Sequence, residues 1–170
     1  MILEARNSRF YASMPKFRKG IEWSGVSIIE FDESDFKCKG YEMEELKLDQ
    51  VDAVPGTSNM RVRGTFRCET LLREIDGRYT YEDDMPDWAG DWLRPSSYGV
   101  ASSVVEGMYD VKGAAMTLET RKLTLERPGP YHFPDDYVYQ LRVFPDMLKG
   151  HFHSATTPQW QIEIAVVRRK

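Results

Sequence analysis

Cysteine is scarce in this chain: only Cys38 and Cys68 occur among its 170 residues. Small secreted domains commonly depend on several disulfides, and two cysteines cannot supply such a framework. Near the N-terminus, Ile2 and Leu3 are followed at once by Glu4, so this segment lacks the apolar core of a secretion signal. We therefore expect a cytoplasmic protein with two reduced thiols.

Long hydrophobic runs and an excess of positive charge are missing too. No stretch approaches the roughly 20 apolar residues that a membrane-spanning helix needs. The formal net charge is −4 and the isoelectric point is near 5.5, whereas a surface that binds a nucleic-acid duplex needs a dominant basic face. The sequence predicts neither a membrane span nor a nucleic-acid partner.

The motifs of several common enzyme classes are also missing. The sequence has no G-x-S-x-G element, which argues against a triad hydrolase of that type. It has no G-x-G-x-x-G element and no phosphate-binding lysine loop, which argues against the common nucleotide-binding folds. We expect no cofactor, and no catalytic residue is identified by motif.

What the chain does have is regular alternation of apolar and polar residues, clearest in residues 137–144, 148–155 and 160–167. In the last segment, Ile162 and Ile164 alternate with polar neighbours such as Glu163. Successive side chains of a strand point to opposite faces, so this pattern is typical of strands with one buried and one exposed face.

Such segments recur along the chain between turn clusters rich in proline, glycine and asparagine. Their spacing predicts about eight antiparallel strands between residues 21 and 168, in an all-β barrel or sandwich. We expect one domain over residues 1–170, with helix limited to an N-terminal strap (residues 1–19) and to residues 87–93. The acid-rich residues 39–54 predict a solvated strand, at an edge of the sheet.

The alternation also predicts which side chains are buried. The expected core consists of large apolar residues on the inner rows of these strands: Trp23, Val62, Phe66, Leu118, Leu141, Phe152, Trp160, Ile162 and Ile164.

Residues 60–70 alternate with particular regularity and place Arg61, Arg63 and Arg67 on one exposed face. A row of arginines is either a partner site or one half of a set of cross-strand ion pairs. The second interpretation is favoured, with the acids of residues 42–45 as the expected partners.

Residues 73–97 contain the longest irregular segment, and long loops in compact domains are often functional. Trp88 and Trp92 are four residues apart and share a face if this part forms a helical turn. They form either a lid over the mouth of a barrel or a hydrophobic plug that closes its end.

Several residues resemble the pattern of the calycin barrels, the lipocalin and fatty-acid-binding type. Gly20 and Trp23 open the first strand, Arg168 closes the last, and Gly107 and Gly150 mark two strands between them. In lipocalin-type barrels, a tryptophan of the first strand packs under a basic residue of the last strand. Here two residues separate the glycine from the tryptophan, where the family has one. The resemblance implies a closed barrel with an interior cavity, and it implies no particular ligand.

The most suggestive candidate metal ligands are His151 and His153, which share one face of a strand, with His132 or a carboxylate on a neighbouring strand as a third ligand. The alternation places both on the exposed face, so we predict that they bind no metal. Cys68 falls in the inward row and is expected to be an inert core thiol.

An enzyme of the cyclase or isomerase type needs only a shaped apolar cavity and one or two groups with a shifted pKa. Tyr109, Tyr139 and Glu106 are the inward candidates for that role. Each of them is equally consistent with a structural position.

Three functions are therefore open. The first is a non-enzymatic barrel that binds a small apolar ligand in its interior, with the residues Trp88, Trp92, Tyr109, Tyr139 and Phe66 as the predicted site. The second is a cofactor-free barrel enzyme acting on a polyketide- or terpenoid-like substrate. The third is an interaction module with a side-chain-filled barrel, which forms a homodimer or binds a protein partner through an edge strand. The volume of the interior distinguishes the first two from the third.

Overall fold

The computed structural model describes residues 19–32, 36–77, 87–127, 135–159 and 161–170. The predicted N-terminal helix and Trp160 lie outside these ranges.

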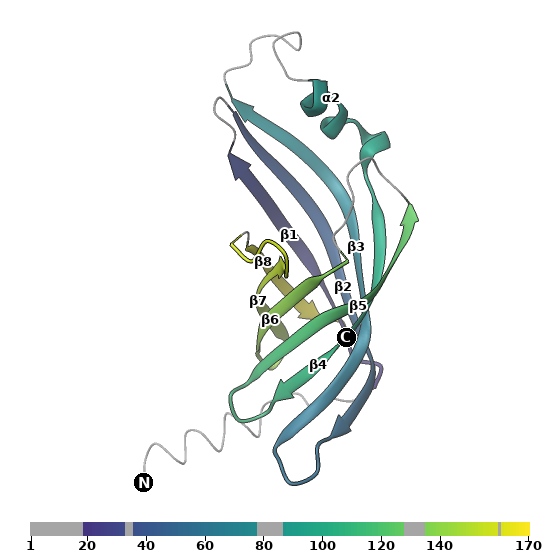
Figure 1. Cartoon of the computed structure of the whole chain (residues 1–170), viewed down its shortest axis with the longest axis vertical. Helices are drawn as coiled ribbons and strands as arrows, with labels where there is room; N and C mark the ends of the chain where they lie inside the picture. The colour runs from purple at the N-terminus through teal and green to yellow at the C-terminus, as the bar shows by residue number, and fades with distance from the viewer. Residues whose placement is uncertain (1–18, 33–35, 78–86, 128–134, 160) are drawn as a thin grey trace.

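Eight antiparallel strands form a closed barrel, in which each strand pairs with the next along the chain and the last pairs with the first (Figure 1). This confirms the predicted all-β antiparallel barrel. The strands are β1 (Glu22–Asp32), β2 (Phe36–Ala53), β3 (Asn59–Gly77), β4 (Val100–Asp110), β5 (Ala115–Arg127), β6 (Tyr137–Val143), β7 (Met147–Ser154) and β8 (Ile162–Arg168).

Helix is confined to short pieces in the described part of the chain. The α-helix α2 (Asp87–Leu93) forms at the residues predicted to be helical, and the 3-10 helix η2 (Pro95–Ser97) follows it. Neither approaches a membrane span in length, and no helix within the described ranges is apolar enough for one.

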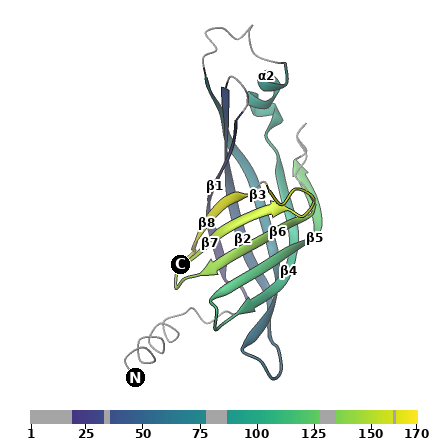
Figure 2. The same ribbon diagram turned by 60° about the vertical axis from the view of Figure 1, so that its left-hand side comes forward.

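The strands differ greatly in length, which divides the barrel into two sections. β2 and β3 have 18 and 19 residues, whereas β6, β7 and β8 have 7 or 8. Among the described residues, β1 pairs with β8 only at residues 23–25, and β5 pairs with β6 only at residues 115–119. The ends of β1 to β5 run on past the short strands toward α2 (Figures 1 and 2). We call the fully paired part the closed section and the part toward α2 the open section.

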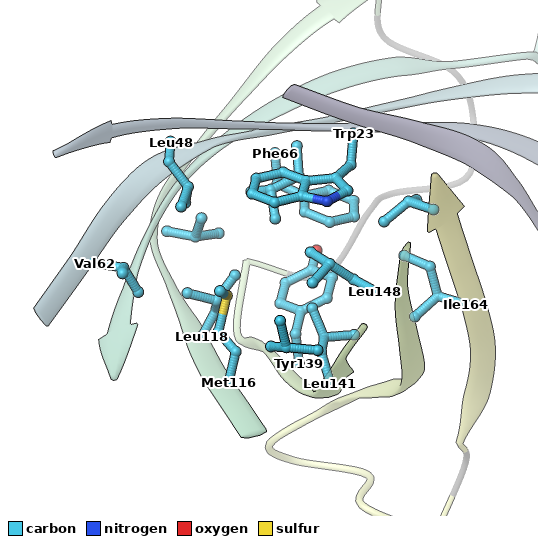
Figure 3. Close-up of a cluster of buried hydrophobic side chains, with 14 of the residues drawn as sticks. Trp23, Leu48, Val62, Phe66, Met116, Leu118, Tyr139, Leu141, Leu148 and Ile164 are labelled. Carbon is cyan, nitrogen blue, oxygen red and sulfur yellow. The ribbon is translucent and has the colours of Figure 1, made fainter. Parts of the chain in front are cut away.

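The hydrophobic core fills the closed section (Figure 3). Most of the predicted core residues are fully buried there, and Ile162 is partly buried against the cluster. The buried members of the predicted set are Trp23, Val62, Phe66, Leu118, Leu141, Phe152 and Ile164.

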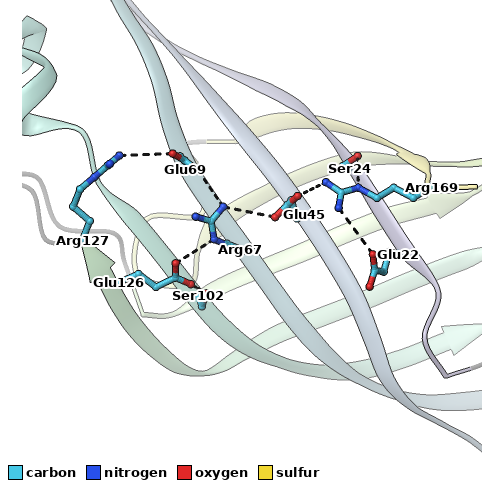
Figure 4. Close-up of polar contacts among 9 residues, drawn as sticks. All are labelled: Glu22, Ser24, Glu45, Arg67, Glu69, Ser102, Glu126, Arg127 and Arg169. Atoms are coloured by element: carbon cyan, nitrogen blue, oxygen red, sulfur yellow. Dashed lines mark hydrogen bonds and ion pairs between the residues drawn. The ribbon is translucent and has the colours of Figure 1, made fainter.

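The outer face carries cross-strand ion pairs, and one of them, between Arg67 and Glu45, joins the arginine row to the predicted acids. Arg67 lies within 3.6 Å of Glu45 on β2 and within 3.2 Å of Glu126 on β5 (Figure 4). Arg63 pairs with Glu106 at 3.4 Å. These groups are partly or well exposed, and such surface pairs contribute at most about 1 kcal/mol each.

The prediction for residues 39–54 was wrong. β2 pairs with β1 on one side and with β3 on the other, so it is an interior strand of the sheet and not an edge. Its acids divide between the two faces: Glu45 points outward, while Glu42 and Glu44 are buried inside. The number of acids indicated a solvated strand, but their alternation places two of them in the row of Leu46 and Leu48.

Candidate functional site

A group of polar side chains lies on the inner face of the barrel where the apolar core ends. Glu42 stands opposite Ser27 on β1 and opposite Thr70 on β3, and Glu44 stands opposite Cys68. All five belong to inward rows, because they continue the alternation of buried residues along their strands. We call these five residues the polar patch.

Hydrogen bonds satisfy part of the polar patch. Ser27 Oγ donates to Glu44 Oε1 at 2.7 Å, and Cys68 Sγ donates to Glu42 Oε2 at 3.0 Å. Glu44 Oε2 and Thr70 Oγ1 have no hydrogen-bond partner among the described residues. Both residues are buried, because Glu44 is 1% exposed and Thr70 is 3% exposed. A buried polar atom without a partner costs about 1–3 kcal/mol. The patch therefore has unused hydrogen-bonding or ligating capacity.

Burial controls the protonation of the patch. Burial raises the pKa of Glu44 well above its ordinary value, and the nearby charge of Glu42 raises it further. Burial also raises the pKa of Glu42, opposed by its hydrogen bond from Cys68 and by the charge of Arg73. Burial and the two carboxylates raise the pKa of the Cys68 thiol. Burial thus disfavours the charged form of each of these three groups.

The roof of the open section is built around Trp92 of α2, which is 6% exposed. Its Cζ2 atom lies 3.8 Å from the position that a Cβ on Gly40 would take, so the indole packs over Gly40 on the inner face of β2. Arg73 Nη1 donates to the Trp92 carbonyl oxygen at 3.1 Å and to Ser97 Oγ at 3.0 Å. The Arg73 guanidinium carbon also lies 5.1 Å from the centroid of the Trp92 ring. The side chain of Trp88 lies outside the described residues.

The β5 wall of the open section is apolar and partly exposed. Leu123 stands opposite Ser103 and Leu125 opposite Ala101, and both partners are buried on the inner face of β4. Leu125 is nevertheless 38% exposed, whereas Leu118 of the same inner row is fully buried in the closed section. The difference arises because β6 does not pair with β5 beyond residue 119.

The predicted site residues separate into two groups. Phe66 and Tyr139 stack at 4.4 Å between ring centroids, and Glu44 is among the groups that raise the pKa of Tyr139, after burial. These two rings therefore lie beside the polar patch. Tyr109 is buried at the opposite end of the core, where it pairs with Met60 and Met116.

Two further candidates lie on the outer face. Glu106 was predicted to point inward, which was wrong: it forms ion pairs with Arg63 and Arg121 outside the barrel. It is an odd number of residues from the inward Tyr109, so both cannot share one face of β4. His151 Nε2 lies 3.0 Å from Gln140 Oε1, and the rings of His151 and His153 are 6.2 Å apart between centroids.

Three sizeable surface hollows avoid the polar patch, and the largest of the three, about 750 Å³, lies at the end of the barrel beside Gly20 and Arg168. One of about 690 Å³ lies over the outer face of β5 to β8, and one of about 490 Å³ lies beside the free edge of β1. Both include Lys149, Gln161 and Glu163 among their lining residues. Their lining mixes polar and apolar residues, and it contains no member of the patch.

Glu42 and Glu44 are the residues that the sequence analysis missed. The signal was present, because both share the parity of Leu46 and Leu48 in an alternating segment. Their proximity to Cys68 was not readable, because it depends on how β2 and β3 are aligned.

Comparison with protein-family models found no match for this chain, and comparisons with curated proteins and with solved structures found none either.

Proposed function

We propose that this chain is a calycin-like barrel that binds a small, mainly apolar ligand in its open section. The observation that carries the proposal is the 38% exposure of Leu125, an inner-face residue of a barrel strand. Large apolar side chains on an inner face are normally covered, and an uncovered one lines a place where an apolar partner gains contact.

The surroundings of Leu125 support a ligand of this kind. Leu123 continues the apolar wall, Trp92 provides an aromatic roof, and Phe66 with Tyr139 forms an aromatic floor beside the polar patch. The core fills the closed section, so the ligand lies above it and does not contact Tyr109.

The calycin-like assignment draws support from the seam of the barrel. Trp23 on β1 stands opposite Arg168 on β8 and is fully buried. This is the arrangement of first-strand tryptophan and last-strand basic residue that the resemblance implies.

A substitution on the inner face tests the proposal. Leu125→Glu introduces a charge into the proposed apolar wall, which is costly to desolvate against an apolar ligand. We expect affinity for the best member of a panel of apolar fluorescent probes to fall at least about tenfold, equivalent to roughly 1.4 kcal/mol. Probe fluorescence provides the readout.

Met108→Glu is the matched control. Met108 has the same 38% exposure, but it points to the outer face of β4, whereas its neighbour Tyr109 points inward. Equal losses of affinity in the two variants would contradict binding on the inner face. Failure of the whole panel to bind the native chain would favour the interaction module instead.

The raised pKa of Glu44 favours a second function, acid–base catalysis on the bound molecule. A carboxylic acid that remains protonated near neutral pH can donate a proton inside an apolar site. For any substrate found, Glu44→Gln is expected to abolish turnover while the substrate still binds. Unchanged turnover in that variant would exclude this role for Glu44.

A further inference from the structure

We propose that Glu42, Glu44 and Cys68 bind a thiophilic divalent cation, Zn²⁺ above all, inside the barrel. One ligand atom from each of the three side chains can be chosen so that all lie within 4.8 Å of one another. They come from adjacent strands, two from β2 and one from β3, in a directly opposed register. This site does not depend on the apolar ligand proposed above, and it is an alternative to the acid–base role of Glu44, because a ligating carboxylate holds no proton.

A second observation points to a ligand at the same place. Thr70 Oγ1 is buried and has no hydrogen-bond partner among the described residues, and Thr70 stands directly opposite Glu42 on the inner face. Glu44 Oε2 is likewise buried and without a partner in the described part of the chain. A cation between the strands satisfies the carboxylate oxygen directly, and the Thr70 hydroxyl can complete the set or hold a water ligand.

The donor types select the metal. A thiolate with two carboxylates suits Zn²⁺ and similar thiophilic ions, whereas Mg²⁺ and Ca²⁺ require sets made of oxygen ligands alone. Zinc bonds of about 2.0–2.3 Å place ligand atoms roughly 3–4 Å apart. Side-chain adjustments of about 1 Å are therefore enough to close the site around an ion.

Zinc binding requires the three ligand side chains to lose their protons. Zn²⁺ replaces the proton of the Cys68 thiol and any proton held by the two carboxyl groups, and these protons pass to solvent. Three anionic ligands around one divalent cation leave a net charge of −1. Arg73, whose charge lowers the pKa of Glu42, lies close enough to offset that charge.

Cobalt substitution tests the site with a readout specific for sulfur. Co²⁺ is titrated into the reduced, chelator-treated full chain, and the expected result is one equivalent bound with the absorption of a cobalt–thiolate bond. One equivalent of Zn²⁺ is expected to remove that absorption and to protect one thiol from alkylation. No cobalt–thiolate absorption in the native chain would overturn the proposal.

Cys38 offers a matched control. It is a buried cysteine on β2 that is not part of the three-residue group. Cys38→Ser is expected to keep the cobalt–thiolate absorption, and Cys68→Ser is expected to lose it. Persistence of the absorption in Cys68→Ser would overturn the assignment.

Glu44→Gln removes a carboxylate ligand and keeps the size of the side chain. It is expected to weaken Co²⁺ binding at least tenfold. Far-UV circular dichroism and a cooperative melt identify variants that remain folded. Probe binding measured with chelator present reports on the apolar site alone, so failure of one site is distinguishable from failure of the other.

Discussion

Glu44 shows at the residue scale how position changes the chemistry of a side chain. It shares β2 with Glu45, which points outward and pairs with Arg67 on the barrel surface. Glu44 points inward, accepts a hydrogen bond from Ser27 and has a raised pKa because it is buried. Adjacent acids in one strand thus have opposite surroundings, because a strand turns successive side chains to opposite faces.

The raised pKa of Glu44 makes stability depend on pH in the metal-free protein. The folded form holds the Glu44 proton more tightly than the unfolded form, so this contribution is present at low pH and is lost as pH rises through the folded pKa. Glu44→Gln cannot titrate, so its free energy of unfolding is expected to fall less between about pH 5 and pH 8. Denaturant midpoints measured in chelator at several pH values give the comparison. Glu45→Gln is the control and is expected to keep the native slope. If the free energy of unfolding of Glu44→Gln depends on pH as steeply as that of the native protein, the prediction is wrong.

At the scale of elements, the seam between β1 and β8 is short and closely packed. Within the described ranges, three residue positions pair the two strands, and Gly25 stands opposite Val166 in that pairing. A Cβ on Gly25 would overlap the carbonyl oxygen of Ala165. The missing side chain therefore allows the two backbones to approach and close the barrel.

Gly25→Ala is expected to destabilise the protein by about 1–3 kcal/mol, because the backbone of β1 or β8 must shift to admit the methyl group. Gly90→Ala is the control within α2, where nothing lies within 4 Å of the added Cβ. That substitution is expected to be neutral or to stabilise by up to about 1 kcal/mol, since alanine favours helix over glycine. Chemical denaturation measures both. Equal stability of the two variants would show that the seam tolerates a side chain.

At the scale of the whole molecule, the barrel combines a filled half with a partly uncovered half. The closed section has strand neighbours on all sides and contains the apolar core. In the open section, β5 beyond residue 119 has β4 as its only strand neighbour in the described part of the chain. The proposed site lies where β1 to β5 extend beyond the shorter strands, under the roof formed by α2.

Hydrogen exchange can detect this division. Amides of β5 residues 115–119 lie between two strands and are expected to exchange slowly, while those of residues 120–127 are expected to open at a lower free energy. β3 residues 62–70, which have neighbours on both sides, serve as the slow reference. Uniform protection along β5 would contradict a two-section barrel.

The sequence by itself determined the strands, the turns between them and the face to which most side chains point. These properties are local: alternation along residues 60–70 sufficed to place Phe66 inside and Arg67 outside. Tertiary structure alone decided that Glu44 faces Cys68 and that Leu125 lies uncovered. The physical reason is that register and neighbouring strand length join residues far apart in the chain, and no local pattern encodes that alignment.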